Sequence, residues 1–195
     1  MFNDYKKIKE LTMASMMLAL MIIASKISIP IGPIPLTLQT FAVFIISLVI
    51  GKKASIIFII YLILGLIGLP VFTSGGGIEY IFMPSFGFII GFIPASFVIG
   101  FASRSNKFYL KYILSILGLF IINVFGVAYM YIIFKYHNAN PKDLMTLVNI
   151  GVAPFIFKDM IIAILSCIIY SRLKIVLYKE KYDENINFNE KKIIK

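Results

Sequence analysis

The sequence predicts an all-α, polytopic integral membrane protein of about six transmembrane helices, with the N- and C-termini in the cytoplasm. Of the 195 residues, 60% are hydrophobic and only 14% are charged, and the mean hydropathy is +0.94. These values lie far outside the composition of soluble domains. Apolar runs fill nearly the whole chain, and most lysines and arginines fall on one side of them. The expected location is the cell membrane, with multiple crossings.

Six apolar segments are candidates for membrane helices. In chain order they are Leu11–Ser25, Leu36–Ile50, Ala54–Leu69, Phe86–Phe101, Tyr112–Phe134 and Phe155–Leu177. A helix of about 16 residues spans only ~24 Å, which is less than a hydrocarbon core of ~30 Å. We therefore expect the shorter helices to continue into neighbouring loops or to thin the bilayer locally.

The distribution of basic residues predicts the orientation. With the N-terminus in the cytoplasm, fifteen lysines and arginines lie inside and three, Lys26, Lys135 and Lys142, lie outside. This bias places both termini in the cytoplasm, with an even number of spans. Residues 1–177 are thus predicted to form a six-helix membrane domain. Residues 178–195 are predicted to form a charged, loosely ordered cytoplasmic tail.

The outer connections are unusual. Proline and glycine prevent regular helix in two of them, residues 27–37 and residues 69–86. Because irregular backbone cannot face lipid, both loops must pack on protein or line a cavity, so we expect the functional site beneath them. In the third outer connection, Asn140 and Asp143 bracket Pro141, which predicts a short interfacial helix that ends at Gly151.

Covalent catalysis lacks the necessary residues. His137 is the only histidine and lies in an outer loop, so no histidine dyad or metal cluster is expected. The run Gly75-Gly76-Gly77 lacks the lysine of a phosphate-binding loop and is interpreted as a flexible loop. No catalytic residue, metal site or cofactor is therefore predicted. If ATP drives this protein, another subunit binds the nucleotide.

Lys158 and Asp159 give the strongest indication of a binding site. Asp159 precedes Arg172 by 13 residues, which places it ~20 Å from the inner boundary and in the outer half of the bilayer. Intramembrane charges are costly unless paired, and they mark functional sites. Ligand binding is favoured over a structural pair, or over Lys158 reaching the outer interface while Asp159 caps backbone. Neighbours on a helix point ~100° apart, so the two can also contact different ends of one ligand.

Four further residues are candidates for ligand contact. Gln39 starts the second segment and Asn123 lies within the fifth, and each is expected either to contact ligand or to bond another helix. Phe86 and Tyr129 belong to a set of aromatic residues at the outer ends of the segments, together with Phe72, Tyr80, Phe88 and Tyr131. These rings fit either an aromatic belt or a wall against which a ligand stacks.

Three motifs in the first half of the chain carry a family resemblance. They are Ile-Pro-Ile-Gly-Pro-Ile-Pro-Leu-Thr-Leu-Gln-Thr at residues 29–40, Tyr-Leu-Ile-Leu-Gly-Leu-Ile-Gly-Leu-Pro-Val-Phe at 61–72, and Pro-Ser-Phe-Gly-Phe-Ile-Ile-Gly-Phe at 84–92. With these motifs and the glycine run, the sequence resembles the BioY family, the biotin-binding S components of energy-coupling-factor (ECF) transporters. The resemblance is strong over residues 29–100 and looser over residues 123–163.

The resemblance implies a biotin site at the outer face, covered by the first loop. It also implies a partner module of a transmembrane T subunit and two ATPases. Asp159 matches the family's aspartate, which the resemblance assigns to the ureido N–H groups, and Ser85 stands where the family has threonine. Many members carry a lysine one turn after the aspartate, where this chain has Ile162. Either Lys158 or loop groups are then expected to hold the biotin carboxylate.

The predicted function is high-affinity biotin binding for uptake, with ATP hydrolysed by the partner subunits. The alternatives are an S component for thiamine or riboflavin, and a self-sufficient secondary carrier that couples transport to an ion through Asp159. An integral membrane enzyme is disfavoured because the catalytic groups are missing.

Overall fold

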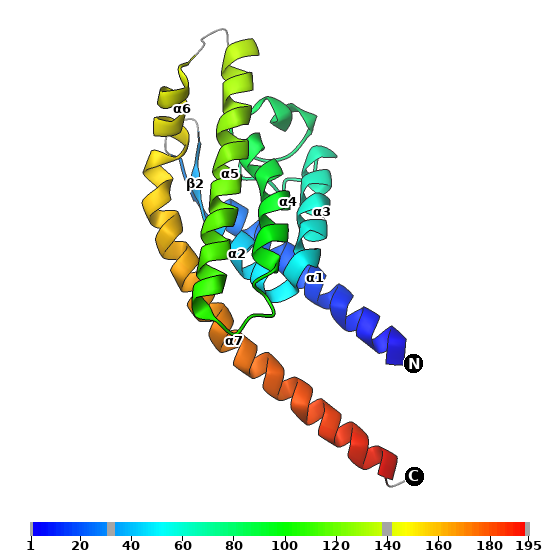
Figure 1. The fold of residues 1–195 in the computed structure, drawn as a ribbon. Helices are drawn as coiled ribbons and strands as arrows, with labels where there is room; N and C mark the ends of the chain where they lie inside the picture. Colours follow the sequence, from blue (N-terminus) through cyan, green and yellow to red (C-terminus); the bar gives the residue numbers. More distant parts are fainter. Residues whose placement is uncertain (1, 31–33, 138–141, 194–195) are drawn as a thin grey trace.

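The computed structural model describes the backbone of residues 2–30, 34–137 and 142–193, and the side chains of these residues except 2, 3, 6 and those beyond Ile175. It is a bundle of α-helices with one short β-hairpin (Figure 1). The long helices are α1 (Phe2–Lys26), α2 (Gln39–Ile50), α3 (Ala54–Leu66), α4 (Phe86–Gly100), α5 (Phe108–Tyr136) and α7 (Ala153–Ile193). The short elements are β1 (Ser28–Ile29), β2 (Leu36–Thr37), the 3-10 helices η1 (Gly51–Lys53) and η2 (Ile78–Phe82), and α6 (Leu144–Gly151).

Helix length and composition confirm a polytopic membrane fold. Four helical stretches are long and apolar enough to cross a membrane, and Phe86–Gly100 is a shorter apolar helix; the four are Lys7–Lys26, Gln39–Leu66, Phe108–Tyr136 and Ala153–Ile175. The second stretch comprises both α2 and α3, which are connected by η1. The chain turns between them at Gly51, whose φ of +78° favours glycine. The six predicted membrane segments are thus all present as helices.

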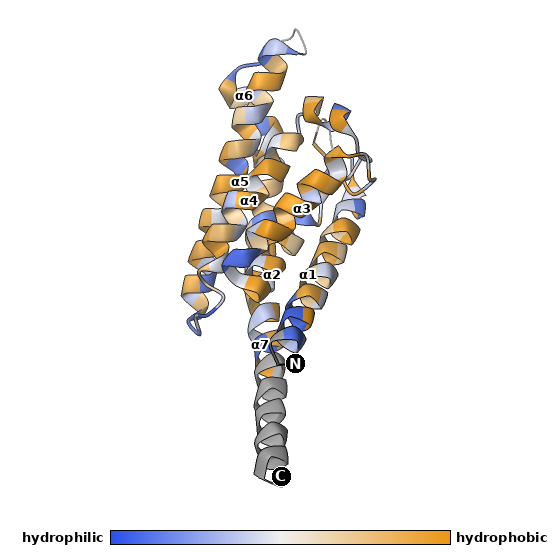
Figure 2. Ribbon diagram, turned by 90° about the vertical axis from the view of Figure 1, so that its right-hand side faces the viewer, coloured by the Kyte–Doolittle hydropathy of each residue, from blue (hydrophilic) through white to orange (hydrophobic). Residues whose placement is uncertain are grey.

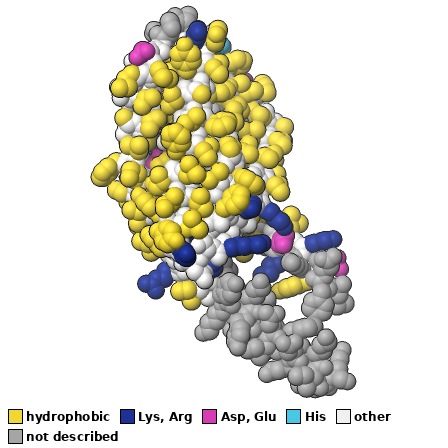
Figure 3. Space-filling view, viewed as in Figure 1, with side chains coloured by type: hydrophobic (Ala, Val, Ile, Leu, Met, Phe, Trp, Pro, Cys, Tyr) yellow, Lys and Arg dark blue, Asp and Glu magenta, His cyan; other side chains and the backbone are white. Residues whose placement is uncertain are grey.

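The outer surface of the bundle suits a lipid environment. Apolar residues cover the helices along most of their length, and polar residues gather at the N-terminal end of α1 (Figure 2). In the space-filling view, hydrophobic side chains cover the visible face, and lysines and arginines cluster toward the end that carries the two termini (Figure 3). This separation agrees with the predicted cytoplasmic placement of the termini.

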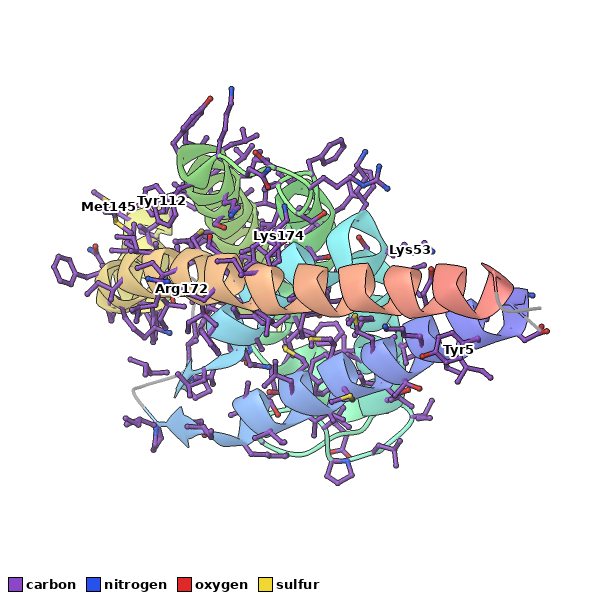
Figure 4. All side chains as sticks on the ribbon, turned by 90° about the horizontal axis from the view of Figure 1, so that it is seen from below. Tyr5, Lys53, Tyr112, Met145, Arg172 and Lys174 are labelled. Atoms are coloured by element: carbon purple, nitrogen blue, oxygen red, sulfur yellow. The ribbon has the colours of Figure 1, made fainter. Side chains whose placement is uncertain are left out.

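Polar contacts join the helices at this cytoplasmic end, which Figure 4 shows from below. Lys53 Nζ lies 3.0 Å from Glu10 Oε2 and joins η1 to α1. Lys174 Nζ donates to Asn106 Oδ1 at 2.9 Å and joins α7 to the loop between α4 and α5. The basic turns predicted on the cytoplasmic side therefore also hold the inner ends of the helices together.

The loop between α3 and α4 is folded into the bundle rather than extended into solvent. Phe72 is fully buried and packs against Tyr61 and Tyr80, with ring centroids 5.4 and 4.5 Å away. Its ring lies where a β-carbon on Gly65 would be, so the loop requires glycine at that point in α3. Lys26 Nζ donates to Phe72 O at 2.5 Å, which fixes the loop to the end of α1.

The glycine run is part of this ordered packing. Gly77 N donates to Gly65 O at 2.7 Å, and Phe72 forms a β-bridge with Gly75. Gly75 and Gly77 adopt φ values of +123° and +114°. The flexible loop expected from the sequence is thus a hydrogen-bonded turn, and these positive φ values explain the glycines physically.

The structure differs from the prediction at the start of α2 and in the tail. Helix α2 begins at Gln39 rather than Leu36, because Leu36–Thr37 pairs with Ser28–Ile29 in the hairpin. The backbone of the tail, expected to be loosely ordered, continues α7 to Ile193. No glycine or proline follows Pro154 to break that helix. One helix therefore crosses the predicted boundary between the membrane domain and the tail.

Helix α6 is the predicted interfacial helix, and its cap at Asp143 and its end at Gly151 agree with the prediction. Asp143 caps α6 and accepts a hydrogen bond from Met145 N at 3.3 Å, and the helix ends at Gly151. Asn140 and Pro141 of the predicted helix start, and Gly32 and Pro33 of the first outer loop, lie outside the residues that the structure describes.

Candidate ligand-binding site

A cavity lies at the outer end of the bundle, between the two irregular loops and the outer ends of α2, α4, α5 and α7. It encloses about 590 Å³ not filled by protein atoms, including the space at its mouth. Its wall comprises Ile34, Pro35, Thr37, Gln39, Thr40, Thr73, Tyr80, Ser85, Phe88, Ile89, Phe92, Ile122, Asn123, Gly151, Phe155, Lys158 and Asp159. Polar and charged groups therefore share a single space with apolar and aromatic side chains, as in many small-molecule sites.

The structure brings five of the seven candidate residues to this cavity. Asp159, Lys158, Gln39, Asn123 and Ser85 all line it, although they come from α7, α2, α5 and the end of the α3–α4 loop. Residues far apart in the sequence thus meet where the two outer loops cover the bundle.

Phe86 and Tyr129 are not part of the cavity wall. Phe86 is buried, and its ring centroid lies 5.6 Å from that of Tyr129. The Tyr129 hydroxyl donates to Ile81 O at 2.6 Å and so holds η2 against α5. The aromatic residues that do face the cavity include Phe88, two positions further along α4. Because successive helical residues point ~100° apart, the composition of this segment could not show which ring faces inward.

Asp159 presents a buried carboxylate to the cavity and is only 6% exposed. Its Oδ1 atom lies 2.8 Å from Lys158 Nζ, so the adjacent charges pair with each other. Lys158 Nζ reaches this oxygen as an ion-pair partner without the angle of a hydrogen bond, and the Thr40 side chain also interacts with the carboxylate. A carboxylate offers about four acceptor sites, so Asp159 keeps acceptor capacity for a ligand that brings a donor.

Lys158 points toward the cavity rather than out to the membrane interface. Its Nζ atom donates to Thr37 O at 3.0 Å, and its side chain is 23% exposed. The lysine thereby connects α7 to strand β2 while neutralising Asp159. Ile162, one turn further along α7, is only 8% exposed, packs in the hydrophobic core and is not part of the cavity wall.

Gln39 both lines the cavity and joins two helices. Its Nε2 atom donates to the Tyr61 hydroxyl at 3.0 Å, and its Oε1 atom accepts from Thr37 Oγ1 at 3.1 Å. Tyr61 is fully buried and donates in turn to Val71 O at 3.0 Å. The interhelical role considered for Gln39 is therefore present, and these hydrogen bonds fix the amide at the wall of the cavity. Contact between Gln39 and a ligand stays a prediction.

The sequence analysis did not identify Tyr61, Thr37, Thr40 or Thr73 as part of this site. Tyr61 appeared only within a family motif, and the threonines lie in or beside irregular loops. The sequence did contain an indication, because a buried tyrosine normally needs a hydrogen-bond partner for its hydroxyl and an amide at a helix start needs one too. Without knowing that α2 packs against α3, the sequence could not show that Tyr61 and Gln39 are each other's partners.

Asn123 and Ser85 complete the polar side. Asn123 is half-buried, and within the described part of the chain no side-chain hydrogen bond to it is found. Ser85 occupies the residue before α4 without capping the helix through its side chain. Both groups can therefore offer hydrogen bonds to a ligand.

A lipid-compatible helical bundle with one outer cavity of this chemistry defines a membrane protein that binds a small polar solute with an apolar portion. In the described residues, no group of three or more His, Cys, Asp or Glu side chains could hold a metal ion. The model of the BioY family matches residues 1–179, and the chain belongs to this family.

Curated relatives and a solved structure agree with this assignment. The chain is 35% identical over 169 residues to the biotin transporter BioY of Thermotoga maritima, covering 85% of this chain and 96% of that protein. It is 36% identical over 170 residues to a probable biotin transporter BioY of Pyrococcus horikoshii, covering 86% and 98%. The crystal structure of an S-component for biotin from an ECF-type ABC transporter is similar, with a TM-score of 0.77 and 31% identity over 87% of this chain and 93% of that one.

Proposed function

We propose that this protein is the biotin-binding S component of an ECF transporter and takes up biotin across the cell membrane. The observation that carries the proposal is the buried Asp159 carboxylate, which lines the cavity beside Lys158 and has acceptor sites left for a ligand. Biotin supplies such donors in its ureido N–H groups. Charge-assisted hydrogen bonds of this type are the strong ones in a site that excludes water.

The apolar part of the wall suits the rest of the biotin bicycle. Phe88, Ile89, Phe92 and Phe155 give an apolar surface for the thioether ring in the same cavity as the carboxylate and amides. Gln39 and Asn123 offer hydrogen bonds in this cavity. A ligand with polar and apolar parts thus finds partners for both.

Lys158 is the proposed partner of the biotin carboxylate. It is the one cationic side chain among the described residues that line the cavity, and Ile162 fills the usual lysine position of the family with a core side chain. Its ammonium group contacts Thr37 O and Asp159 Oδ1, and the third of its three N–H donors is left for a carboxylate. A cation at this wall also disfavours thiamine, whose thiazolium ring is positively charged.

The Asp159→Asn variant tests the ureido assignment. Asparagine keeps the size of the side chain but loses the charge and one acceptor, and a hydrogen bond to a charged group contributes about 1.5–3 kcal/mol. Biotin affinity should therefore fall about ten- to hundredfold, as measured by titration calorimetry of the purified chain. Asp143→Asn, which changes an exposed capping residue outside the cavity, is the matched control. Equal affinities of the Asp159→Asn variant and the unaltered chain would remove Asp159 from the site.

Lys158→Gln tests the carboxylate assignment. Glutamine can still donate to Thr37 O but carries no charge, so biotin should lose more affinity than biotin methyl ester, in which the carboxylate is blocked. Comparing two ligands within one variant cancels any general effect on folding. Equal losses for the two ligands would show that Lys158 does not hold the carboxylate.

We also propose that a T subunit and two ATPases supply the energy for uptake. The support is the family membership and the likeness to an S-component from an ECF-type transporter. Uptake of labelled biotin by cells that express the chain with such a module should persist in a protonophore while ATP is maintained. Uptake that requires the proton gradient at constant ATP would favour a self-sufficient secondary carrier.

A further inference from the structure

A second hollow, the α5–α7 groove, lies beside the proposed biotin cavity. It encloses about 1140 Å³, including the space open to the surroundings. Helix α5 contributes Ile116, Leu119, Phe120, Asn123, Val124, Val127 and Ala128, and the α6–α7 segment contributes Leu144, Val148, Val152, Ile156 and Met160. All of these residues except Asn123 are apolar, and several of them, including Phe120 at 64% exposure, are open to the membrane.

The shape of the α5–α7 groove follows from two helical stripes. The α6–α7 wall repeats every four residues from Leu144 to Met160, and the α5 wall repeats every four residues from Ile116 to Ala128. Twelve residues of rise give the α5 wall a length of about 18 Å. This is close to one leaflet of a hydrocarbon core of about 30 Å and far short of the full core. The groove therefore fits one acyl chain better than a transmembrane helix of a partner.

The outer end of the groove carries a fixed cation. Lys142 precedes the groove residue Leu144 by two positions, and its Nζ atom lies 4.9 Å from the centroid of the Phe134 ring. No acidic side chain in the described part of the chain lies within 4.0 Å of this ammonium group. The neighbouring Asp143 carboxylate caps α6 instead. The ammonium group is thus available for an anion at the level of the lipid headgroups.

We propose that the α5–α7 groove binds one acyl chain of an anionic outer-leaflet phospholipid, whose phosphate contacts Lys142. Asn123 lines both the groove and the biotin cavity, so the acyl chain covers the membrane side of the cavity wall. The bound acyl chain thereby keeps water away from the groove side of Asn123, so that its amide group faces the biotin cavity. This site depends on the membrane fold and is independent of which solute the cavity binds.

The absence of tryptophan from the sequence permits a direct test. Phe120→Trp places a fluorescent reporter in the groove. Phe157→Trp places one outside it, at a 76% exposed position on α7 between the groove residues Ile156 and Met160. Each variant is reconstituted in phosphatidylcholine bilayers with increasing brominated phosphatidylglycerol or brominated phosphatidylcholine. Quenching then reports which lipid occupies the site next to the reporter.

The expected preference for phosphatidylglycerol is about fivefold at Phe120→Trp, the value for one lysine at a membrane surface, and close to one at Phe157→Trp. Lys142→Gln should abolish the preference. Lys135→Gln, which removes an equal charge from a lysine held over Tyr131 and Tyr136, should leave it intact. Equal preferences at the two reporters, or a preference that survives Lys142→Gln, would overturn the proposal.

Discussion

The Tyr61→Phe variant tests the hydrogen bonds that position Gln39 at the cavity wall. The substitution removes one hydroxyl from a fully buried ring and leaves the packing against Phe72 in place. Two hydrogen bonds are lost, one from Gln39 Nε2 and one to Val71 O. Ser25 Oγ lies 2.7 Å from both Val71 O and Ile22 O, so in the variant its single proton can serve Val71 O. Only the Gln39 N–H group is therefore left without its partner.

The expected loss in the free energy of unfolding follows from this one unpaired N–H group and from the surroundings of Gln39. A buried, unpaired polar group costs about 1–3 kcal/mol, but Gln39 borders a cavity that water can enter. Interhelical hydrogen bonds in membrane proteins average about 0.6 kcal/mol and reach about 1.7 kcal/mol. We therefore expect Tyr61→Phe to lower the free energy of unfolding by about 0.6–1.7 kcal/mol.

Unfolding of the detergent-solubilised chain by a denaturing detergent measures this change. Tyr109→Phe, at a 58% exposed position, is the matched control and should change the free energy by less than about 0.5 kcal/mol. In a Gln39→Leu background the Tyr61→Phe penalty should shrink, because the N–H group is already absent. An unchanged penalty in that background would refute the Gln39–Tyr61 bond as its source. Equal stability of the Tyr61→Phe and Tyr109→Phe variants would refute the reasoning altogether.

Two further substitutions probe the outer loops. Gly65→Ala should destabilise the fold by about 1–3 kcal/mol, because a β-carbon would overlap the buried Phe72 ring. Thermal unfolding of this variant is compared with that of Gly68→Ala, where the β-carbon meets no atom within 4 Å but φ is +106°. The comparison separates steric overlap from backbone strain. Asp143→Ala should cost α6 about 0.5–2 kcal/mol through its lost cap, which faster hydrogen exchange at Met145 and its neighbours would report. Unchanged exchange there would show that the cap does not stabilise α6.

Much of the fold was predictable because the ends of the apolar runs coincide with prolines, glycines and basic residues. Helix α3 begins at Ala54 and helix α4 at Phe86, as predicted, since a basic turn precedes the first and an outer proline precedes the second. The β-hairpin was not predicted. Leu36 and Thr37 continue an apolar run, and a short run of this type does not distinguish strand from helix. The pairing with Ser28–Ile29 depends on a contact between segments that no local pattern encodes.

The cavity was predictable to the extent that its polar groups stand out against lipid. Asp159, Lys158, Gln39 and Asn123 were found because polar side chains within apolar segments are costly and need a reason. Tyr80 and Phe88 belonged to the predicted set of outer aromatic residues but could not be distinguished from Phe86 and Tyr129, because every face of these helices is apolar, one toward the core and another toward lipid. Helix rotation then depends on packing, which placed Phe88 rather than Phe86 at the cavity.

The most direct test of the central claim is titration calorimetry of the detergent-purified chain alone with biotin, with thiamine and riboflavin as controls. Saturable binding of biotin at nanomolar to low micromolar affinity, with no binding of either control, is the predicted result. Binding of thiamine or riboflavin without biotin would contradict the claim and assign the cavity to a different solute.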